Sequence, residues 1–162
     1  MYTDEPGSIS AERINNPGSA WHEAQRCLHG DRPEKAVTYL QRAVELDPKF
    51  TDAHYNLAVL YYQLGQLEAA CREYEVILTL QPQDVDVLNN LGTIKASRGS
   101  LEEAKEMFDK ALAIDAEFAL THRNLAAYYQ RKGEIEKTAE HARRAKELDS
   151  KVFEREPGPP KL

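Results

Sequence analysis

Apolar residues recur along this chain at the spacing of amphipathic helices. In the stretch 101–112 they follow one another at steps of three, four, three and one, which places them on one face of a helix. These positions are Leu101, Ala104, Phe108, Ala111 and Leu112. Ser100 stands directly before them as a candidate N-cap, with Glu103 three residues later as its capping-box partner. An earlier helical pattern ends at Gly99, because glycine readily adopts the left-handed backbone that ends a helix. The segment therefore predicts two helices joined by a tight turn.

The same pattern returns at a spacing of 34 residues. Three kinds of position carry the period: an Asn-Leu pair, a glycine and a closing aliphatic residue. The glycines are Gly65, Gly99 and Gly133, and the closing residues are Leu46, Leu80, Ile114 and Leu148. Pro48 and Pro82 follow two of the closing residues, where proline prevents the helix from continuing. Four copies in phase predict four tandem helical hairpins, at about residues 17–50, 51–84, 85–118 and 119–152.

This unit resembles the tetratricopeptide repeat, which has characteristic small, aromatic, glycine and proline places within 34 residues. Tyr61 and Tyr129 fill the eleventh place of their copies, which is aromatic in that family. The resemblance implies an all-α fold, a right-handed α-solenoid of antiparallel helix pairs that forms a superhelix. The first copy departs from the pattern, because Gly30 and Ala36 have one extra residue between them. The register of its first helix is therefore open by one residue.

The ends of the chain differ in composition from the repeats. We expect residues 18–152 to form the repeat domain, with a flexible segment at 1–17 apart from a short turn near Ile9 to Ile14. The proline-rich tail at 153–162 is expected to be disordered. The last second helix, from Ile135 to Leu148, is rich in charge, and we interpret it as a polar cap of the array.

Net charge narrows the range of partners. The chain carries a formal charge of −6, which opposes general binding to nucleic acid. No apolar stretch approaches the length of a membrane span, so membrane insertion is not expected. The start of the chain is acidic and has no apolar run of a signal peptide, and the two cysteines, Cys27 and Cys71, form no CxxC pattern. These features predict a cytoplasmic protein.

No catalytic or metal-binding motif emerges from the residue pattern. His22-Glu23 begins like the zinc motif HExxH, but the second histidine position is occupied by Arg26. There is no glycine-rich phosphate loop, and no nucleophile has an identifiable base. The sequence therefore predicts no enzyme, no metal site and no cofactor.

The family resemblance implies that six places of each first helix line a concave groove. Carried onto this chain, those places are aromatic in the first half, basic in the last copy, and carry an Asn column at the sixth place between them. An amide side chain both donates and accepts hydrogen bonds, so the Asn column suits the backbone of an extended peptide. Alternatively, these amides bond within the solenoid. The candidate groove residues are Trp21, Tyr55, Asn56, Tyr62, Asn89, Asn90, Arg123, Asn124 and Arg131.

The predicted function is that of a protein–protein interaction adaptor or scaffold, which binds a peptide or partner segment in the concave groove. Two alternatives share the same fold: a self-associating structural scaffold, and an assembly or secretion chaperone for one client. The residues do not name the partner, the pathway or the oligomeric state, because one fold serves many functions.

Overall fold

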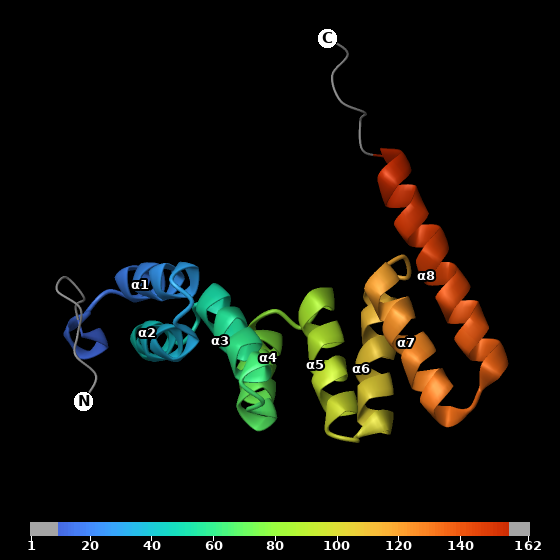
Figure 1. The fold of residues 1–162 in the computed structure, drawn as a ribbon, viewed down its shortest axis with the longest axis horizontal. Helices are drawn as coiled ribbons and strands as arrows, with labels where there is room; N and C mark the ends of the chain where they lie inside the picture. Colours follow the sequence, from blue (N-terminus) through green and yellow to red (C-terminus); the bar gives the residue numbers. More distant parts are fainter. Residues whose placement is uncertain (1–9, 156–162) are drawn as a thin grey trace, which may run out of the picture. The chain divides into compact units, whose positions relative to one another are not determined.

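The computed structural model describes the backbone of residues 10–155 and the side chains of residues 10–150. This part of the chain is helical throughout, with no strand (Figure 1). The short 3-10 helix η1 (Ala11–Arg13) precedes eight α-helices. They are α1 (Pro17–His29), α2 (Pro33–Leu46), α3 (Thr51–Gln63), α4 (Leu67–Leu80), α5 (Val85–Ser97), α6 (Leu101–Ile114), α7 (Ala119–Lys132) and α8 (Ile135–Arg155). The predicted all-α fold of tandem antiparallel helix pairs is confirmed.

The chain divides into two compact units, Met1–Pro82 and Gln83–Leu162. The first contains the pairs α1–α2 and α3–α4, and the second contains α5–α6 and α7–α8. None of the helices in residues 10–155 is long and apolar enough to cross a membrane.

Each helix pair turns on one residue with a left-handed backbone. Gly65, Gly99 and Gly133 have φ angles of 72°, 86° and 76°, and in the first pair Asp31 takes the same role with φ 52°. The next residue donates its N–H to the carbonyl five residues earlier, near the end of the first helix, as in a Schellman motif. The four N···O bonds are Arg32 to Cys27 (2.9 Å), Gln66 to Tyr61 (2.8 Å), Ser100 to Lys95 (2.9 Å) and Glu134 to Tyr129 (3.0 Å).

These turns settle the register of the first copy. Asp31, rather than Gly30, occupies the glycine place, exactly one period before Gly65. Aspartate is among the few residues besides glycine that visit the left-handed region as single residues. There is therefore no inserted residue, and the 34-residue spacing holds from the first helix onward.

Close packing in the second unit depends on a glycine. A Cβ atom built on Gly92 of α5 would lie 2.5 Å from Cε1 of Phe108 in α6, too close for any side chain. The Phe108 ring is 2% exposed and belongs to a core with Ala104, Leu125, Tyr128 and Tyr129. The glycine thus lets the two helices of this pair approach within contact of the ring.

The capping box predicted at the start of α6 is wrong. The Ser100 side chain accepts no hydrogen bond from the first-turn backbone. The Glu103 carboxylate instead accepts from Lys95 Nζ at 2.7 Å. The lysine stands at a place that is aromatic in related copies, and its bond occupies the carboxylate in place of a capping-box bond to the backbone.

Ordered contacts occur at both ends of the expected repeat domain. Ile14 is 6% exposed, and its carbonyl accepts from Arg42 Nε of α2 at 2.9 Å. The Asn16 side chain caps α1 by accepting from Ser19 N at 3.0 Å. Ile14, in the stretch where a short turn is expected, thus packs on the first pair, and α8 continues to Arg155, past the expected domain boundary at 152. Residues 1–9 and 156–162 lie outside the described part of the chain.

The left-handed turns make a stability prediction. Asp31→Gly should raise the free energy of unfolding by up to about 1 kcal/mol, because glycine has no Cβ to clash in this conformation. Gly99→Ala should lower it by about 1 kcal/mol for the opposite reason. Urea unfolding followed by circular dichroism measures both changes. A destabilising Asp31→Gly, with Gly99→Ala neutral, would contradict the assignment of these turns.

Candidate functional site

The predicted groove residues fall in both units. Trp21, Tyr55, Asn56 and Tyr62 belong to the first, and Asn89, Asn90, Arg123, Asn124 and Arg131 to the second. Each unit therefore carries its own set of candidate side chains.

Exposed aromatic surface in the first unit comes from α3. Tyr55 and Tyr62 are 36% and 42% exposed, and the Tyr55 ring stands edge-on to the buried Tyr74 at 5.6 Å. Trp21 of α1 packs instead against Phe50, with ring centroids 6.2 Å apart. Its indole N–H is buried without a hydrogen-bond partner among the described residues, so this donor does not face a ligand.

A pocket of about 120 Å³ opens in the second unit between α5, α6 and α7. Its lining combines polar and small residues, here called its walls, with three large apolar or aromatic residues, here called its floor. The wall residues are Thr93, Ala96, Ser97, Asn124, Ala127 and Arg131, and the floor residues are Leu101, Phe108 and Tyr128. Two of the nine predicted residues, Asn124 and Arg131, thus meet in one cavity.

The amide of Asn124 is bonded within the unit. Its Nδ2 donates to Asn89 Oδ1 at 3.0 Å and to Thr93 Oγ1 at 3.2 Å. Both donor positions are thereby used. For Asn124 the alternative raised from the sequence is correct, since the amide nitrogen links α7 to α5. Its Oδ1 is the atom left to accept from a ligand.

The prediction of Asn89 as a groove residue is wrong. Asn89 is 1% exposed, because the following helix pair packs over it and Asn124 lies against its side-chain oxygen Oδ1. Its Nδ2 and the hydroxyl of Thr121 in α7 are both buried without a partner among the described residues. The place of Asn89 in its repeat does not predict its burial. Whether the residue at the fifth place is exposed depends on which side chain of the next repeat packs against it.

Two arginines that look equivalent in the sequence have different roles. Arg131 donates from one guanidinium nitrogen to the carbonyl of Ala96 at 3.2 Å, near the end of α5, and keeps further donors at the pocket wall. Arg123 instead donates to Asp149 Oδ1 of α8 at 3.1 Å. Arg131 is therefore the cation of the pocket, and Arg123 is engaged by an acidic residue of its own chain.

Glu102 of α6 holds one side of the pocket floor. Its carboxylate accepts from Tyr128 Oη at 3.0 Å and from Lys132 Nζ at 2.8 Å. The hydrogen bond from Lys132 lowers the pKa of Glu102, with that from Tyr128 acting in the same direction. Burial, and then the bond to Glu102, raises the pKa of Tyr128. The phenol therefore stays a neutral donor aimed at Glu102, which orients its ring beneath the pocket.

The floor residues were absent from the sequence-based site. Leu101 and Phe108 follow the helical spacing of core positions, and no feature of the repeat pattern singles out Tyr128. They nevertheless line the pocket, because residues of α6 as well as of the two first helices surround it. Across the described residues, no group of three or more His, Cys, Asp or Glu side chains is arranged to hold a metal ion.

Repeated antiparallel helical hairpins define an all-α repeat protein. Two sequence profiles described as tetratricopeptide repeat match residues 28–93 and 85–114. The chain belongs to the tetratricopeptide repeat family.

The fold is similar to that of solved structures of MamA. The crystal structure of MamA is 21% identical, covers 88% of this chain and 84% of its own, and superposes with a TM-score of 0.80. The structure of MamA 41-end from Desulfovibrio magneticus RS-1 is 24% identical over 86% of this chain and 78% of its own, with a TM-score of 0.77. No curated protein matches the chain in sequence. At these identities the likeness concerns the fold.

The two kinds of Asn in the column are separable by mutation. Asn124→Ala should lower the free energy of unfolding by about 1–3 kcal/mol, because it leaves the buried Asn89 amide with no partner on either side. Asn56→Ala, at the same place two periods earlier, should change it by less than about 0.5 kcal/mol. Urea unfolding of both variants measures the difference. Equal effects would show that Asn124 has no special structural role.

Proposed function

We propose that this protein is an interaction adaptor that binds an extended segment of a partner protein in the pocket between α5 and α7. The tetratricopeptide fold is that of protein–protein interaction scaffolds, which are generally non-enzymatic. The observation that supports this site is the meeting of the Arg131 guanidinium and the Asn124 amide oxygen above an apolar floor.

The size of the pocket favours a side chain of a peptide over a free small molecule. Pockets for drug-sized ligands or cofactors occupy about 300–1,000 Å³. The cavity here is about 120 Å³, which suits a single apolar side chain resting on Phe108 and Leu101. The remainder of the ligand then lies along the helices outside the cavity, as an extended chain does.

The polar groups of the pocket walls favour a particular kind of residue beside that apolar side chain in the peptide. A guanidinium group pairs well with a carboxylate, often through two parallel hydrogen bonds. Arg131 is exposed and has donors beyond the one that Ala96 accepts. The Ser97 hydroxyl donates to Thr93 O at 3.0 Å, so its oxygen is left to accept, whereas the Thr93 hydroxyl donates to Asn89 O at 3.0 Å and already accepts from Asn124 Nδ2. The preferred segment carries an acidic residue beside an apolar one.

The exposed aromatics of the first unit form a second proposed contact surface. Tyr55 and Tyr62 of α3 project from this unit, and aromatic residues are enriched in the cores of protein interfaces. Asn56 and Asn90 stay predicted groove residues on the family pattern. A cytoplasmic location, a lack of nucleic-acid binding and the absence of a cofactor also remain predictions from the sequence.

Peptide selection tests the pocket. Panning the intact protein against a random peptide library should recover segments with an acidic residue adjacent to an apolar one. Arg131→Gln should weaken the binding of a recovered peptide about tenfold or more, because a hydrogen bond to a charged group contributes about 1.5–3 kcal/mol. Isothermal titration calorimetry measures the change, and the affinity should fall as salt rises.

Arg143→Gln is the matched control. Arg143 lies in α8 of the same unit, where its guanidinium pairs with Glu147 at 2.8 Å and does not line the pocket. Its loss should leave the peptide affinity unchanged. If both changes weakened peptide binding equally, the loss would come from the lower net charge alone, which would contradict the proposed site. A self-associating scaffold, the alternative function, would instead show a mass that rises with concentration in light scattering, whether or not peptide is present.

A further inference from the structure

The second and fourth repeats build the same histidine site with different partners. In α3, His54 Nδ1 lies 2.7 Å from Glu73 Oε2 of α4, and its Nε2 lies 3.1 Å from the Pro48 carbonyl. In α7, His122 Nδ1 lies 2.9 Å from His141 Nδ1 of α8, and its Nε2 lies 3.1 Å from the Ala116 carbonyl. Every member of the second site stands two 34-residue periods after its counterpart. The one chemical difference is histidine in place of glutamate.

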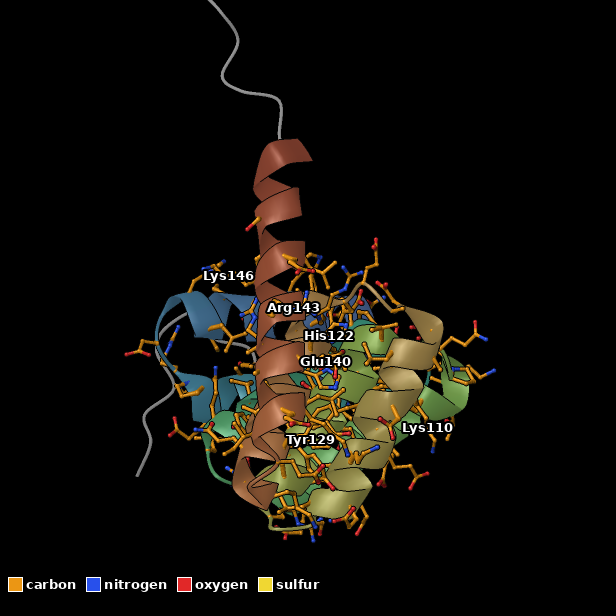
Figure 2. All side chains as sticks on the ribbon, turned by 90° about the vertical axis from the view of Figure 1, so that its right-hand side faces the viewer. Lys110, His122, Tyr129, Glu140, Arg143 and Lys146 are labelled. Carbon is orange, nitrogen blue, oxygen red and sulfur yellow. The ribbon has the colours of Figure 1, made fainter. Side chains whose placement is uncertain are left out.

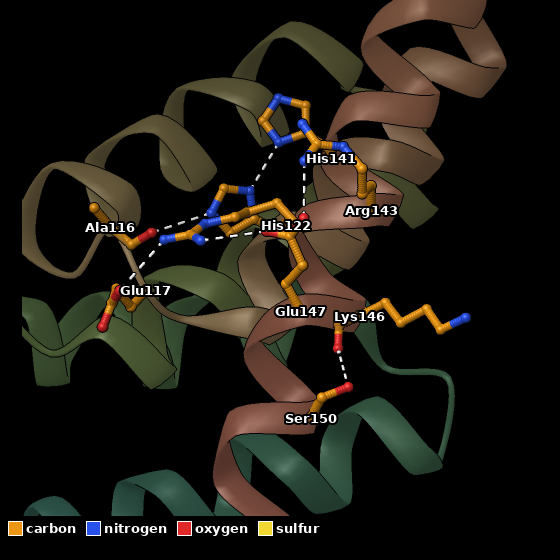
Figure 3. Close-up of polar contacts among 9 residues, drawn as sticks. Ala116, Glu117, His122, His141, Arg143, Lys146, Glu147 and Ser150 are labelled. Carbon is orange, nitrogen blue, oxygen red and sulfur yellow. Dashed lines mark hydrogen bonds and ion pairs between the residues drawn. The ribbon is translucent and has the colours of Figure 1, made fainter. Parts of the chain in front are cut away.

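Both central imidazoles are buried and hold three segments together. His54 is 6% exposed and His122 is 8% exposed. Each joins the loop before its own helix to the second helix of its pair, as Figure 3 shows for Ala116, His122 and His141. Arg144 adds an ion pair between α8 and the same loop, from its guanidinium to Glu117 at 3.3 Å. The His122–His141 bond is thus part of the seam that fixes α8 to α7.

The proton count of the two sites differs. A carbonyl only accepts, so the Nε2 of each central histidine carries a hydrogen. Neutral His122 then accepts at Nδ1 from the Nδ1–H of His141, and one added proton can still be accommodated by reversing that bond. A second added proton places N–H groups on both Nδ1 atoms, and the bond is lost with two positive charges facing each other. At His54 the partner is a carboxylate, which accepts from a charged imidazole at least as well as from a neutral one.

The groups around His141 limit its charging. Burial lowers the pKa of His141, and the charge of His122 lowers it further, whereas Lys105 of α6 lowers it least of the neighbouring charges. Glu140 of α8 and Asp109 of α6 act in the opposite direction but contribute less. The Tyr129 ring of α7 stacks on the imidazole at 5.4 Å, with Lys137 Nζ over that ring at 5.0 Å. Glu117 and Arg144, near the loop, are paired with each other. In Figure 2, α8 faces the viewer with Glu140 labelled along it.

We propose that the His122–His141 pair is an acid-sensitive contact, which releases α8 from α7 when both imidazoles are protonated, while the α3–α4 pair keeps its corresponding contact. A histidine whose pKa is lowered by folding binds more protons in the unfolded chain than in the folded one, so stability falls as pH drops below about 6.5. Above that value the contact contributes fully. Mild acidification therefore acts on the C-terminal helix of the array and on the helix that carries Arg131.

Hydrogen–deuterium exchange of the intact chain at pH 7.5 and pH 5.5, corrected for the intrinsic pH dependence, tests this proposal. Amides of α7 and α8 should exchange faster at the lower pH. The expected increase is about tenfold for each pH unit by which the second protonation of the pair falls below the pKa of a free histidine. Amides of α3 and α4 should show no such increase. Equal responses in the two pairs, or none in α8, would overturn the proposal.

Two variants at one position separate the proton count from general acid sensitivity. His141→Gln keeps a group that can donate to or accept from His122 at either pH, so the difference in exchange between the two pH values should largely disappear. His141→Glu recreates the His54–Glu73 pairing and should abolish or reverse that difference. The comparison is made within each variant, so a change in overall stability does not affect it, and if the Glu variant does not fold the Gln variant decides. A pH response in the Gln variant equal to that of the unmodified protein would overturn the proposal.

Discussion

One backbone feature, the left-handed residue that closes each first helix, fixes how every helix pair of this protein packs. It directs the chain back at the same place in all four copies, with the same carbonyl bonded across the turn. The facing positions of the two helices are then the same in each pair. This is why His122 meets His141 as His54 meets Glu73, and why any difference between copies comes from side chains alone.

Much of the fold could be predicted from the sequence because it is set by local, periodic constraints. The 34-residue spacing locates the helix pairs, and the glycines mark their turns. The register of the first copy was ambiguous because Asp31 takes the left-handed conformation that glycine has in the other copies, which only the backbone angle reveals. The site was predicted less well, since the burial of Asn89 and the inward bond of Asn124 depend on contacts between successive pairs. No pattern within one repeat encodes such contacts.

The pocket shows how structural and binding roles divide within one side chain. Asn124 gives its amide nitrogen to Asn89 and Thr93, which positions its oxygen, while Arg131 anchors one nitrogen on Ala96 and keeps the others at the wall. Tyr128 is oriented by Glu102 from behind. The groups that would meet a ligand are therefore held in place before it arrives, which reduces the entropy lost on binding. Loss of the contact between α7 and α8 in acid would disturb the same helix that carries two of these groups.

The most direct test of the account is a nuclear magnetic resonance titration of the isotope-labelled protein with a peptide that carries adjacent acidic and apolar residues. The account predicts saturable shifts of the Arg131 side-chain Nε–H and of the backbone amides of Thr93 and Ala127, which surround the pocket. Saturable shifts confined to the outer residues of α8, such as Arg143 and Lys146, with the pocket signals unchanged, would contradict it.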